Sequence, residues 1–268
     1  MKNLYFDSGG DLAERVSRPG FELNEGKCRN YIQQICRGLA YVHKQDIVHL
    51  DLKPFNLVFA TVEEDSILKI TDFTFAKRLT AYDNPNIATK STKISAMNGT
   101  VEFLAPEMIE CSYATFATDC WSVGIIAYML VTGGRSPFYG GHRFRTIGKI
   151  LSCQYDLHGP EFNYISREAK DFIQQLLQSQ QTHRMNINQC LKHDWLEGED
   201  VPGETMHTLE VIPSLEVKDS NLHAPSVLTL LIYEFPLHES KIYLSSLTFN
   251  LTLAGFCGRC AAAPDLPF

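Results

Sequence analysis

The longest amphipathic pattern in the chain lies between residues 24 and 43. Its apolar positions recur at helical spacing and include Tyr31, Ile35, Leu39 and Val42. Asn24 stands just before this pattern, where an N-cap residue is expected. We therefore predict a long helix that buries one face and ends near His43.

Short extended segments are predicted after this helix. Residues 46–49 form the first, and a polar loop over 51–56 follows it. Residues 57–59 and 67–70 are apolar and flank an acidic turn, so they predict two small strands.

Residues 119–131 are apolar on nearly every side. A helix with no polar face is usually buried in the centre of a domain, so we place this segment there. Gly9-Gly10-Asp11 predicts the start of another, short helix. Further helices are predicted, with Trp195 closing the series, over residues 146–153, 166–177 and 187–191.

Two polar or irregular segments complete the pattern. Residues 80–98 are rich in Ser, Thr, Asn and Lys and show no periodicity, which predicts a long mobile loop. Repeated prolines interrupt residues 199–268, where positive charges are few, so we expect a disordered or irregular tail. We also expect no calmodulin binding from this tail, because calmodulin targets are basic amphipathic helices. The predicted division is a domain over 1–198 and a tail over 199–268.

Composition narrows the classes of function. The net charge is -7 and the pI about 5.7, which argues against a nucleic-acid partner. The apolar runs over 124–131 and 227–233 are far shorter than the roughly 20 residues that span a bilayer, so no membrane partner is expected. No secretory signal is visible and the 8 cysteines are scattered, which predicts a cytoplasmic or nuclear protein with reduced thiols.

The strongest chemical signal is the octapeptide over residues 49–56, His-Leu-Asp-Leu-Lys-Pro-Phe-Asn. Asp51, Lys53 and Asn56 lie together in a loop entered from a strand. Phosphoryl transfer needs a carboxylate near the attacking hydroxyl, a cation near the phosphoryl oxygens and an oxygen ligand for magnesium. The three side chains supply those groups.

Other motifs follow in a consistent order. Asp72 comes directly after an apolar strand, which places a second carboxylate where it could hold magnesium. Asn98-Gly99-Thr100 and Ala105-Pro106-Glu107 close the long polar loop. Asp119 then begins the buried helix, and Arg184 lies well downstream. Chance does not account well for this many motifs in one order.

In these motifs the sequence resembles the protein kinases of the Ser/Thr class. Within them it looks most like the calmodulin-dependent-kinase group, especially the death-associated protein kinases, their apoptosis-inducing relatives and the myosin light chain kinases. The features that carry this likeness are the segments over 9–12, 49–51 and 191–196. The resemblance implies transfer of phosphate from ATP, with Mg²⁺, to Ser or Thr hydroxyls of protein substrates. Its implied context is intracellular signalling, including apoptosis.

The resemblance also implies roles for single residues. Asp51 matches the catalytic base, Lys53 the residue that contacts the transferred phosphate, and Asn56 and Asp72 the magnesium ligands. Thr100 would hydrogen-bond near Asp51 and Lys53. Glu107 and Arg184 look like a buried ion pair. The residues expected around adenine and ribose are Tyr5 and Asp7 in the hinge, Asp11 at the ribose, and Val58 in the adenine floor.

The sequence departs from the family pattern at its start. No G-x-G-x-x-G motif, strand lysine or partner glutamate precedes the hinge. The predicted fold class is therefore mainly α (α+β), a kinase-like C-terminal helical lobe with a small β element and the N-terminal lobe absent. On this interpretation the 268-residue chain is inactive by itself. A non-catalytic, pseudokinase-like interaction module is the alternative, as is a fragment without a stable fold.

Three substitutions inside the matched region bear on activity. Thr74 stands where the family usually has glycine, which would restrict a left-handed backbone. Phe55 replaces an acidic or amide residue that often recognises basic peptides, so basophilic specificity is in question. Leu50 replaces an arginine that would pair with an activation-loop phosphate, so we do not expect the Ser and Thr residues of 90–95 to act as a switch.

Overall fold

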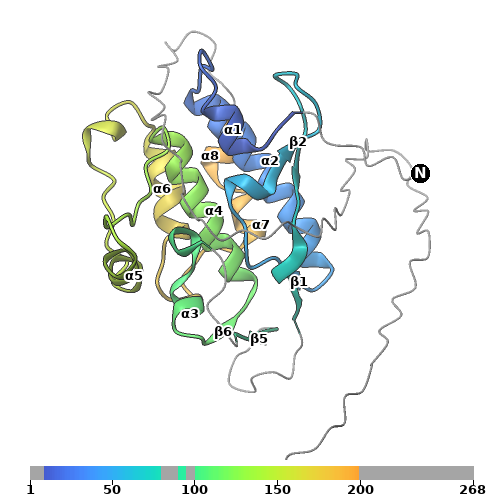
Figure 1. Cartoon of the computed structure of the whole chain (residues 1–268), viewed down its shortest axis with the longest axis vertical. Helices are drawn as coiled ribbons and strands as arrows, with labels where there is room; N and C mark the ends of the chain where they lie inside the picture. Colours follow the sequence, from blue (N-terminus) through green and yellow to red (C-terminus); the bar gives the residue numbers. More distant parts are fainter. Residues whose placement is uncertain (1–8, 80–89, 95–99, 199–268) are drawn as a thin grey trace, which may run out of the picture. The chain divides into compact units, whose positions relative to one another are not determined.

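The computed structural model describes residues 9–79, 90–94 and 100–198. Three predicted features lie outside these ranges: the tail, the hinge residues Tyr5 and Asp7, and most of the loop over 80–98. The helices are α1 (Leu12–Val16), α2 (Glu25–Lys44), α3 (Pro106–Ile109), α4 (Phe116–Val131), α5 (Arg143–Leu151), α6 (Arg167–Leu176), α7 (Ile187–Cys190) and α8 (Asp194–Glu197) (Figure 1).

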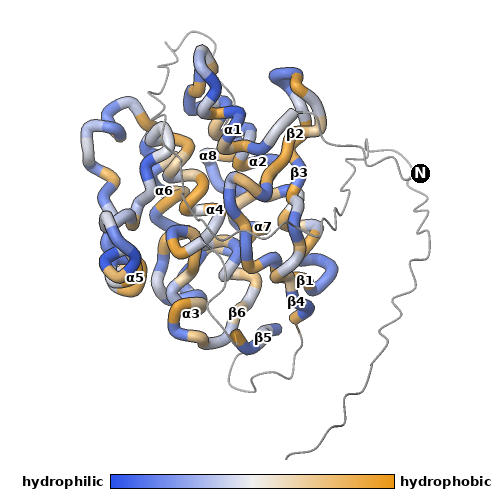
Figure 2. The backbone as a smooth tube through the Cα atoms, viewed as in Figure 1, coloured by the Kyte–Doolittle hydropathy of each residue, from blue (hydrophilic) through white to orange (hydrophobic). Residues whose placement is uncertain are grey.

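Helix α4 lies in the middle of the domain, with α2 on one side and α6 on the other (Figure 1). Every residue from Thr118 to Val131 is buried, which confirms the prediction of a central helix without a polar face. Figure 2 shows hydrophobic residues gathered on the elements around α4. Helix α2 is amphipathic instead and packs its apolar side against α4 and β3.

The helix starts follow from ordinary capping chemistry. Asn24 Oδ1 accepts a hydrogen bond from the backbone N–H of Lys27 at 2.9 Å, which confirms the predicted N-cap of α2. Asp11 caps α1 in the same way through the N–H of Glu14. Thr115 and Asn186 form capping boxes at α4 and α7. Helix α4 begins three residues before the predicted Asp119 because its cap lies at Thr115.

The described residues contain three two-stranded antiparallel sheets. Strand β1 (Ile47–Val48) pairs with β4 (Lys77–Arg78), β2 (Leu57–Phe59) with β3 (Leu68–Ile70), and β5 (Thr92–Lys93) with β6 (Tyr113–Ala114). The first two pairs hold the loops that carry the candidate site. The third pair places part of the segment predicted as a loop, residues 92–93, in a strand.

Candidate functional site

The loop over residues 49–56 brings the predicted catalytic side chains together. Lys53 Nζ donates to Asp51 Oδ2 at 2.8 Å, and Asn56 Nδ2 donates to the same oxygen at 3.1 Å and to the Asp51 carbonyl at 2.8 Å. Asp51 and Asn56 are buried, and the Lys53 side chain is 19% exposed. One face of the Asp51 carboxylate is therefore fixed, while its Oδ1 has no hydrogen bond among the described residues.

The β2–β3 pair positions Asp72 beside this loop. Leu57 pairs with Ile70 in register, and beyond that pair the N–H of Thr71 donates to the Asn56 carbonyl at 2.8 Å. Asp72 is the next residue, so the pairing brings it to the end of the strand where Asn56 lies. Its backbone is left-handed, with φ at 60°.

Asn56 and Asp72 fit the role of magnesium ligands. The Asn56 amide donates both its bonds to Asp51, so its oxygen is left without a partner in the described part of the chain. Asp72 uses Oδ1 to accept from the backbone N–H and the hydroxyl of Thr74 and retains Oδ2. The described residues contain no cluster of three or more His, Cys, Asp or Glu side chains suited to a metal. Mg²⁺ is commonly held by one or two such oxygens together with substrate phosphates, which agrees with this arrangement.

His49 links the two loops. Its Nε2 lies 3.0 Å from the Thr71 carbonyl, and its Nδ1 accepts from the N–H of Asp51 at 3.3 Å. A neutral imidazole with the proton on Nε2 satisfies both contacts. The ring also packs edge-on against Phe73, with 4.8 Å between centroids. Asp51 and Asp72 are thus coupled through one fully buried side chain.

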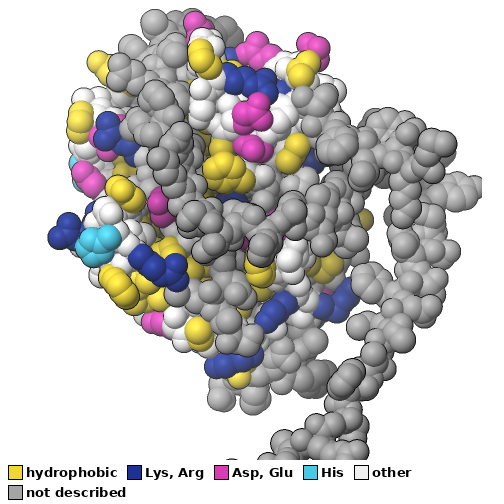
Figure 3. All heavy atoms as spheres, viewed as in Figure 1, with side chains coloured by type: hydrophobic (Ala, Val, Ile, Leu, Met, Phe, Trp, Pro, Cys, Tyr) yellow, Lys and Arg dark blue, Asp and Glu magenta, His cyan; other side chains and the backbone are white. Residues whose placement is uncertain are grey.

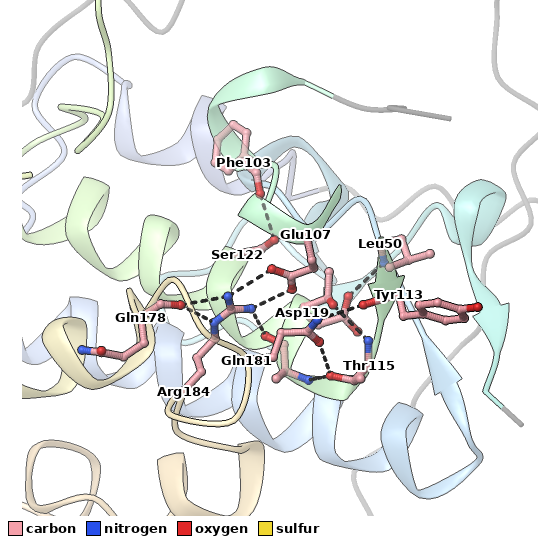
Figure 4. A network of polar contacts seen from close by, with 12 residues as sticks. Leu50, Phe103, Glu107, Tyr113, Thr115, Asp119, Ser122, Gln178, Gln181 and Arg184 are labelled. Atoms are coloured by element: carbon pink, nitrogen blue, oxygen red, sulfur yellow. Dashed lines mark hydrogen bonds and ion pairs between the residues drawn. The ribbon is translucent and has the colours of Figure 1, made fainter. Parts of the chain in front are cut away.

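Asp119 anchors the start of the loop over residues 49–56, a role that was not predicted from the sequence. Its carboxylate accepts from the backbone N–H of Leu50 at 2.9 Å (Figure 4). It also accepts from the backbone N–H of His49 at 2.8 Å, and His43 Nε2 lies 2.8 Å from Oδ2. Leu50 has φ at 66°, which is uncommon outside glycine. A signal existed in the sequence: a lone carboxylate in an otherwise apolar helix needs buried partners.

The predicted ion pair between Glu107 and Arg184 is present and buried. The guanidinium makes two bonds to the carboxylate, at 2.9 and 3.2 Å (Figure 4). It also donates to the carbonyls of Ala117 and Gln178, so all its N–H groups are used. The pair ties α3 to α4 and to the segment after α6.

The residues predicted near the nucleotide are placed only in part. Asp11 and Val58 form an isolated β-bridge, so these two lie together as the prediction requires. Asp11 Oδ1 accepts the hydrogen bond that caps α1. Burial raises the pKa of the Asp11 carboxyl, although nearby backbone N–H groups act to lower it. Thr100 is described, but no hydrogen bond joins it to Asp51 or Lys53 among the described residues. Its role stays a prediction, as do those of Tyr5 and Asp7.

Two further predictions concern exposed or strained positions. Thr74 lies in a 3₁₀ turn over Phe73–Phe75 with ordinary backbone angles, and the left-handed residue is Asp72 instead. Phe55 is 39% exposed and lies within the loop over residues 49–56, on the turn Pro54–Asn56. Phe55 offers no carboxylate with which a basic side chain of a substrate could pair.

Comparisons with known proteins agree with this geometry. A sequence model described as "Protein kinase domain" matches residues 4–196. The chain is 42% identical over 190 residues to smooth muscle myosin light chain kinase of Gallus gallus, covering 71% of this chain and 9% of that protein. It is 40% identical over 193 residues to myosin light chain kinase family member 4 of Homo sapiens, covering 72% and 47%. The chain thus spans less than half the length of these relatives.

Solved structures point the same way. The twitchin kinase region of C. elegans matches with a TM-score of 0.65 and 36% identity, covering 77% of this chain and 34% of that one. A twitchin kinase fragment with immunoglobulin domains matches with a TM-score of 0.64 over 74% of this chain.

These matches correct the predicted fold class. We expected only a C-terminal lobe with the N-terminal lobe absent, but residues 4–196 match the protein kinase domain as such, as do the twitchin kinase structures. The restriction to one lobe was wrong. It rested on local motifs that were not found, and a missing motif is a weak guide to the extent of a domain. The family model matches residues 4–196, which is most of this chain. The chain therefore belongs to the protein kinase family, in the Ser/Thr class, and is similar to the calmodulin-dependent kinases.

Proposed function

We propose that this site transfers the γ-phosphate of ATP to Ser or Thr hydroxyls of protein substrates. The observation that carries the proposal is the state of the Asp51 carboxylate. One oxygen is held by Lys53 and Asn56, and the other has no hydrogen bond among the described residues. A general base must lie within hydrogen-bond reach of the proton it takes, in a fixed orientation, and Asp51 meets the second condition already.

Each neighbour of Asp51 has a separate task in this proposal. Asp51 orients the substrate hydroxyl and accepts its proton. Lys53 keeps further N–H donors beyond the one directed at Asp51, and these would stabilise the phosphoryl oxygens. Asn56 and Asp72 would hold Mg²⁺ through their remaining oxygens. When bound, Mg-ATP supplies the phosphoryl group and offsets its charge; this chain's residues provide position and electrostatics.

The nucleotide side of the site is proposed from the family pattern and the observed neighbours. Val58 is half-buried next to Asp11, so one apolar surface and one carboxylate oxygen lie together for adenine and ribose. Tyr5 and Asp7 would contribute backbone groups in the hinge. Thr100 would contact Asp51 and Lys53 once substrate is bound.

A non-catalytic interaction module is the second candidate, and one contact favours it. Thr74 Oγ1 donates to Asp72 Oδ1 at 2.5 Å, so part of the magnesium-binding carboxylate is engaged inside the protein. A weaker hold on Mg²⁺ would leave a kinase fold that binds partners without transferring phosphate. The intact set of Asp51, Lys53, Asn56 and Asp72 makes us prefer catalysis.

The cellular location, signalling context and partners of the protein are proposed in part from its relatives. We propose a cytoplasmic or nuclear enzyme of apoptotic or cytoskeletal signalling, with a closeness to death-associated kinases that the myosin light chain kinase matches do not decide. Protein substrates are its proposed partners, without nucleic acid, membrane or calmodulin. Basic and acidic side chains both occur on the face shown in Figure 3. No helix of the described residues is long and apolar enough to span a bilayer.

Phosphate transfer can be tested directly. The purified protein would be incubated with γ-labelled Mg-ATP and three peptides that differ at one position, Ser, Tyr or Ala. We expect label on the Ser peptide alone, lost on removal of Mg²⁺ and in Asp72→Ala. Label on the Tyr peptide would contradict the Ser/Thr assignment. ATP binding without any transfer would favour the interaction module.

A further inference from the structure

Helix α5 buries one face and exposes an apolar face to solvent. Thr146 and Ile150 are its buried residues. Phe144, Ile147 and Leu151 recur at the i, i+3, i+7 spacing that brings residues to one side of a helix. Phe144 is 81% exposed, more than any other large hydrophobic side chain of the described residues, and Leu151 is 41% exposed. An apolar stripe of this kind usually packs on another element, and here it lies open.

Gly148 lies within the same stripe, between Phe144 and Leu151. A Cβ built on it would meet no atom within 4 Å, so nothing stands above the backbone at this point. From Phe144 to Leu151 the stripe is about 10 Å long, or two helical turns. A glycine in its middle allows another chain to approach the backbone closely. We call Phe144, Ile147, Gly148 and Leu151 together the α5 face.

The α5 face lies in the most one-sided charge environment of an otherwise acidic chain. The net charge of the protein is -7, yet residues 120–155 contain no Asp or Glu and include Arg135, Arg143, Arg145 and Lys149. At 100° per residue, Arg143 and Arg145 lie on opposite edges of the face. Both are exposed, and neither forms an ion pair within the described part of the chain. Figure 3 shows Lys or Arg beside hydrophobic side chains where Figure 1 places α5.

These features favour one occupant over the alternatives. A short apolar stripe at helical spacing suits the apolar side of another helix, and unpaired arginines at both edges suit Asp or Glu beside that side. A second copy of this chain would instead bring the same arginines against one another. A membrane surface is less suitable, because Gly148 leaves only Phe144 and Leu151 to insert.

We propose that the α5 face binds an acidic amphipathic helix of a partner protein. The ring of Phe144 would enter the apolar side of the partner helix, which would pass over Gly148. Carboxylates along the two edges of that helix would pair with Arg143 and Arg145. Because the face contains none of the residues proposed for phosphate transfer, its occupancy can be measured without an activity assay.

The probe is a synthetic peptide with Leu at helical spacing on one side and Glu along both edges of that side. An internal cross-link keeps it helical, because short helices are marginal in water. The matched control has Lys in place of each Glu. Both are titrated into the ¹⁵N-labelled full chain and followed by NMR. We expect the acidic peptide to shift the amide signals of Ile147, Gly148 and Leu151 and to bind more weakly as salt is added. The Lys peptide should not bind.

Three variants make the test specific. Phe144→Ser removes a ring that lies outside the core and should weaken binding of the acidic peptide at least about tenfold. Gly148→Glu places a side chain and a like charge in the middle of the face and should abolish binding. Tyr41→Ser removes another exposed aromatic side chain, on α2, and should leave binding unchanged.

Several results would overturn the proposal while the proposed phosphate transfer still stands. They are equal binding of the Lys peptide, binding that survives Phe144→Ser, and no binding of the acidic peptide up to its solubility. Two further measurements identify a different occupant. Self-association in sedimentation that is lost in Phe144→Ser would assign the face to a second copy. Binding to vesicles of anionic lipid that is lost in Phe144→Ser would assign it to a membrane.

Discussion

At the scale of single residues, the site depends on carboxylates whose two oxygens have different tasks. Asp51, Asp72 and Asp11 each give one oxygen to a neighbour in the chain and keep the other. The spacing of Asp51, Lys53 and Asn56 was sufficient to predict that their side chains lie together. The engaged oxygens were not predictable, because they depend on loop conformations such as the left-handed Asp72, which local sequence does not specify.

Thr74 offers a residue-scale test of the magnesium site. Thr74→Ala removes the hydroxyl that bonds to Asp72 Oδ1 and leaves only the backbone N–H of residue 74 on that oxygen, which makes it a better ligand for the ion. We expect the Mg²⁺ concentration for half-maximal phosphate transfer to fall about fivefold. Thr74→Ser keeps the hydroxyl and should behave like the original protein. A rise in the Mg²⁺ requirement of Thr74→Ala would mean that the hydroxyl supports the site.

Asp11 provides a pH test. Burial raises the pKa of its carboxyl in the folded chain, so the charged carboxylate opposes folding. The free energy of unfolding therefore falls as pH rises and this carboxyl loses its proton. Asn caps helices as well as Asp does. Asp11→Asn should therefore be more stable than the original protein at about pH 7, and the difference should vanish near pH 3. Urea unfolding across this range measures it; a difference that does not change with pH would refute the cause.

At the scale of elements, the helices were predicted well because caps and periodicity are local. Asn24 and the apolar stripe behind it defined α2 to within a residue or two. Helix α4 was recognised from its lack of a polar face, but its start was missed because the Thr115 capping box lies before the apolar run. The pairing of β5 with β6 joins residues about twenty apart and left no local pattern.

The α4–α6 contact depends on Gly124. A Cβ there would lie 2.8 Å from Leu176 Cβ and 2.9 Å from Leu177 Cδ2, so the helices could not stay as close. Gly124→Ala should lower the free energy of unfolding by about 1–3 kcal/mol. Gly148 in α5 has open space around it, and Gly148→Ala should raise stability by about 0.5–1 kcal/mol. Denaturant unfolding of both variants checks this; a neutral Gly124→Ala would contradict the packing argument.

The Glu107–Arg184 pair connects elements far apart in the chain. Arg184→Ala leaves Glu107 buried and unpaired, so we expect a loss of about 3–5 kcal/mol in unfolding free energy. Glu107→Met combined with Arg184→Met removes both charges and should cost clearly less than the sum of the single changes. Unfolding by urea of the original protein, Glu107→Met, Arg184→Met and the double Met variant gives the four corners of the cycle, and Arg184→Ala is measured beside them. An Arg184→Ala loss below about 1 kcal/mol would show that solvent reaches the pair.

At the scale of the whole molecule, the order of motifs identified the family where no single motif could. Five short patterns along the chain predicted a Ser/Thr kinase, and the match over residues 4–196 confirms the family. The extent of the fold was not predictable in the same way. Motifs report on the residues that contain them, and the prediction of one lobe drew a conclusion from motifs that were missing.

The proposed phosphate transfer depends on Asp51 as the base, and a pair of Asp→Asn variants tests this role. Asp51→Asn keeps the size of the side chain and removes the proton acceptor, whereas Asp65→Asn makes the same change at an exposed residue between β2 and β3. Initial rates of label transfer from γ-labelled Mg-ATP to a Ser peptide would be measured for both variants. We predict a loss of at least about 100-fold for Asp51→Asn and none for Asp65→Asn. Full activity in a folded Asp51→Asn protein would contradict it.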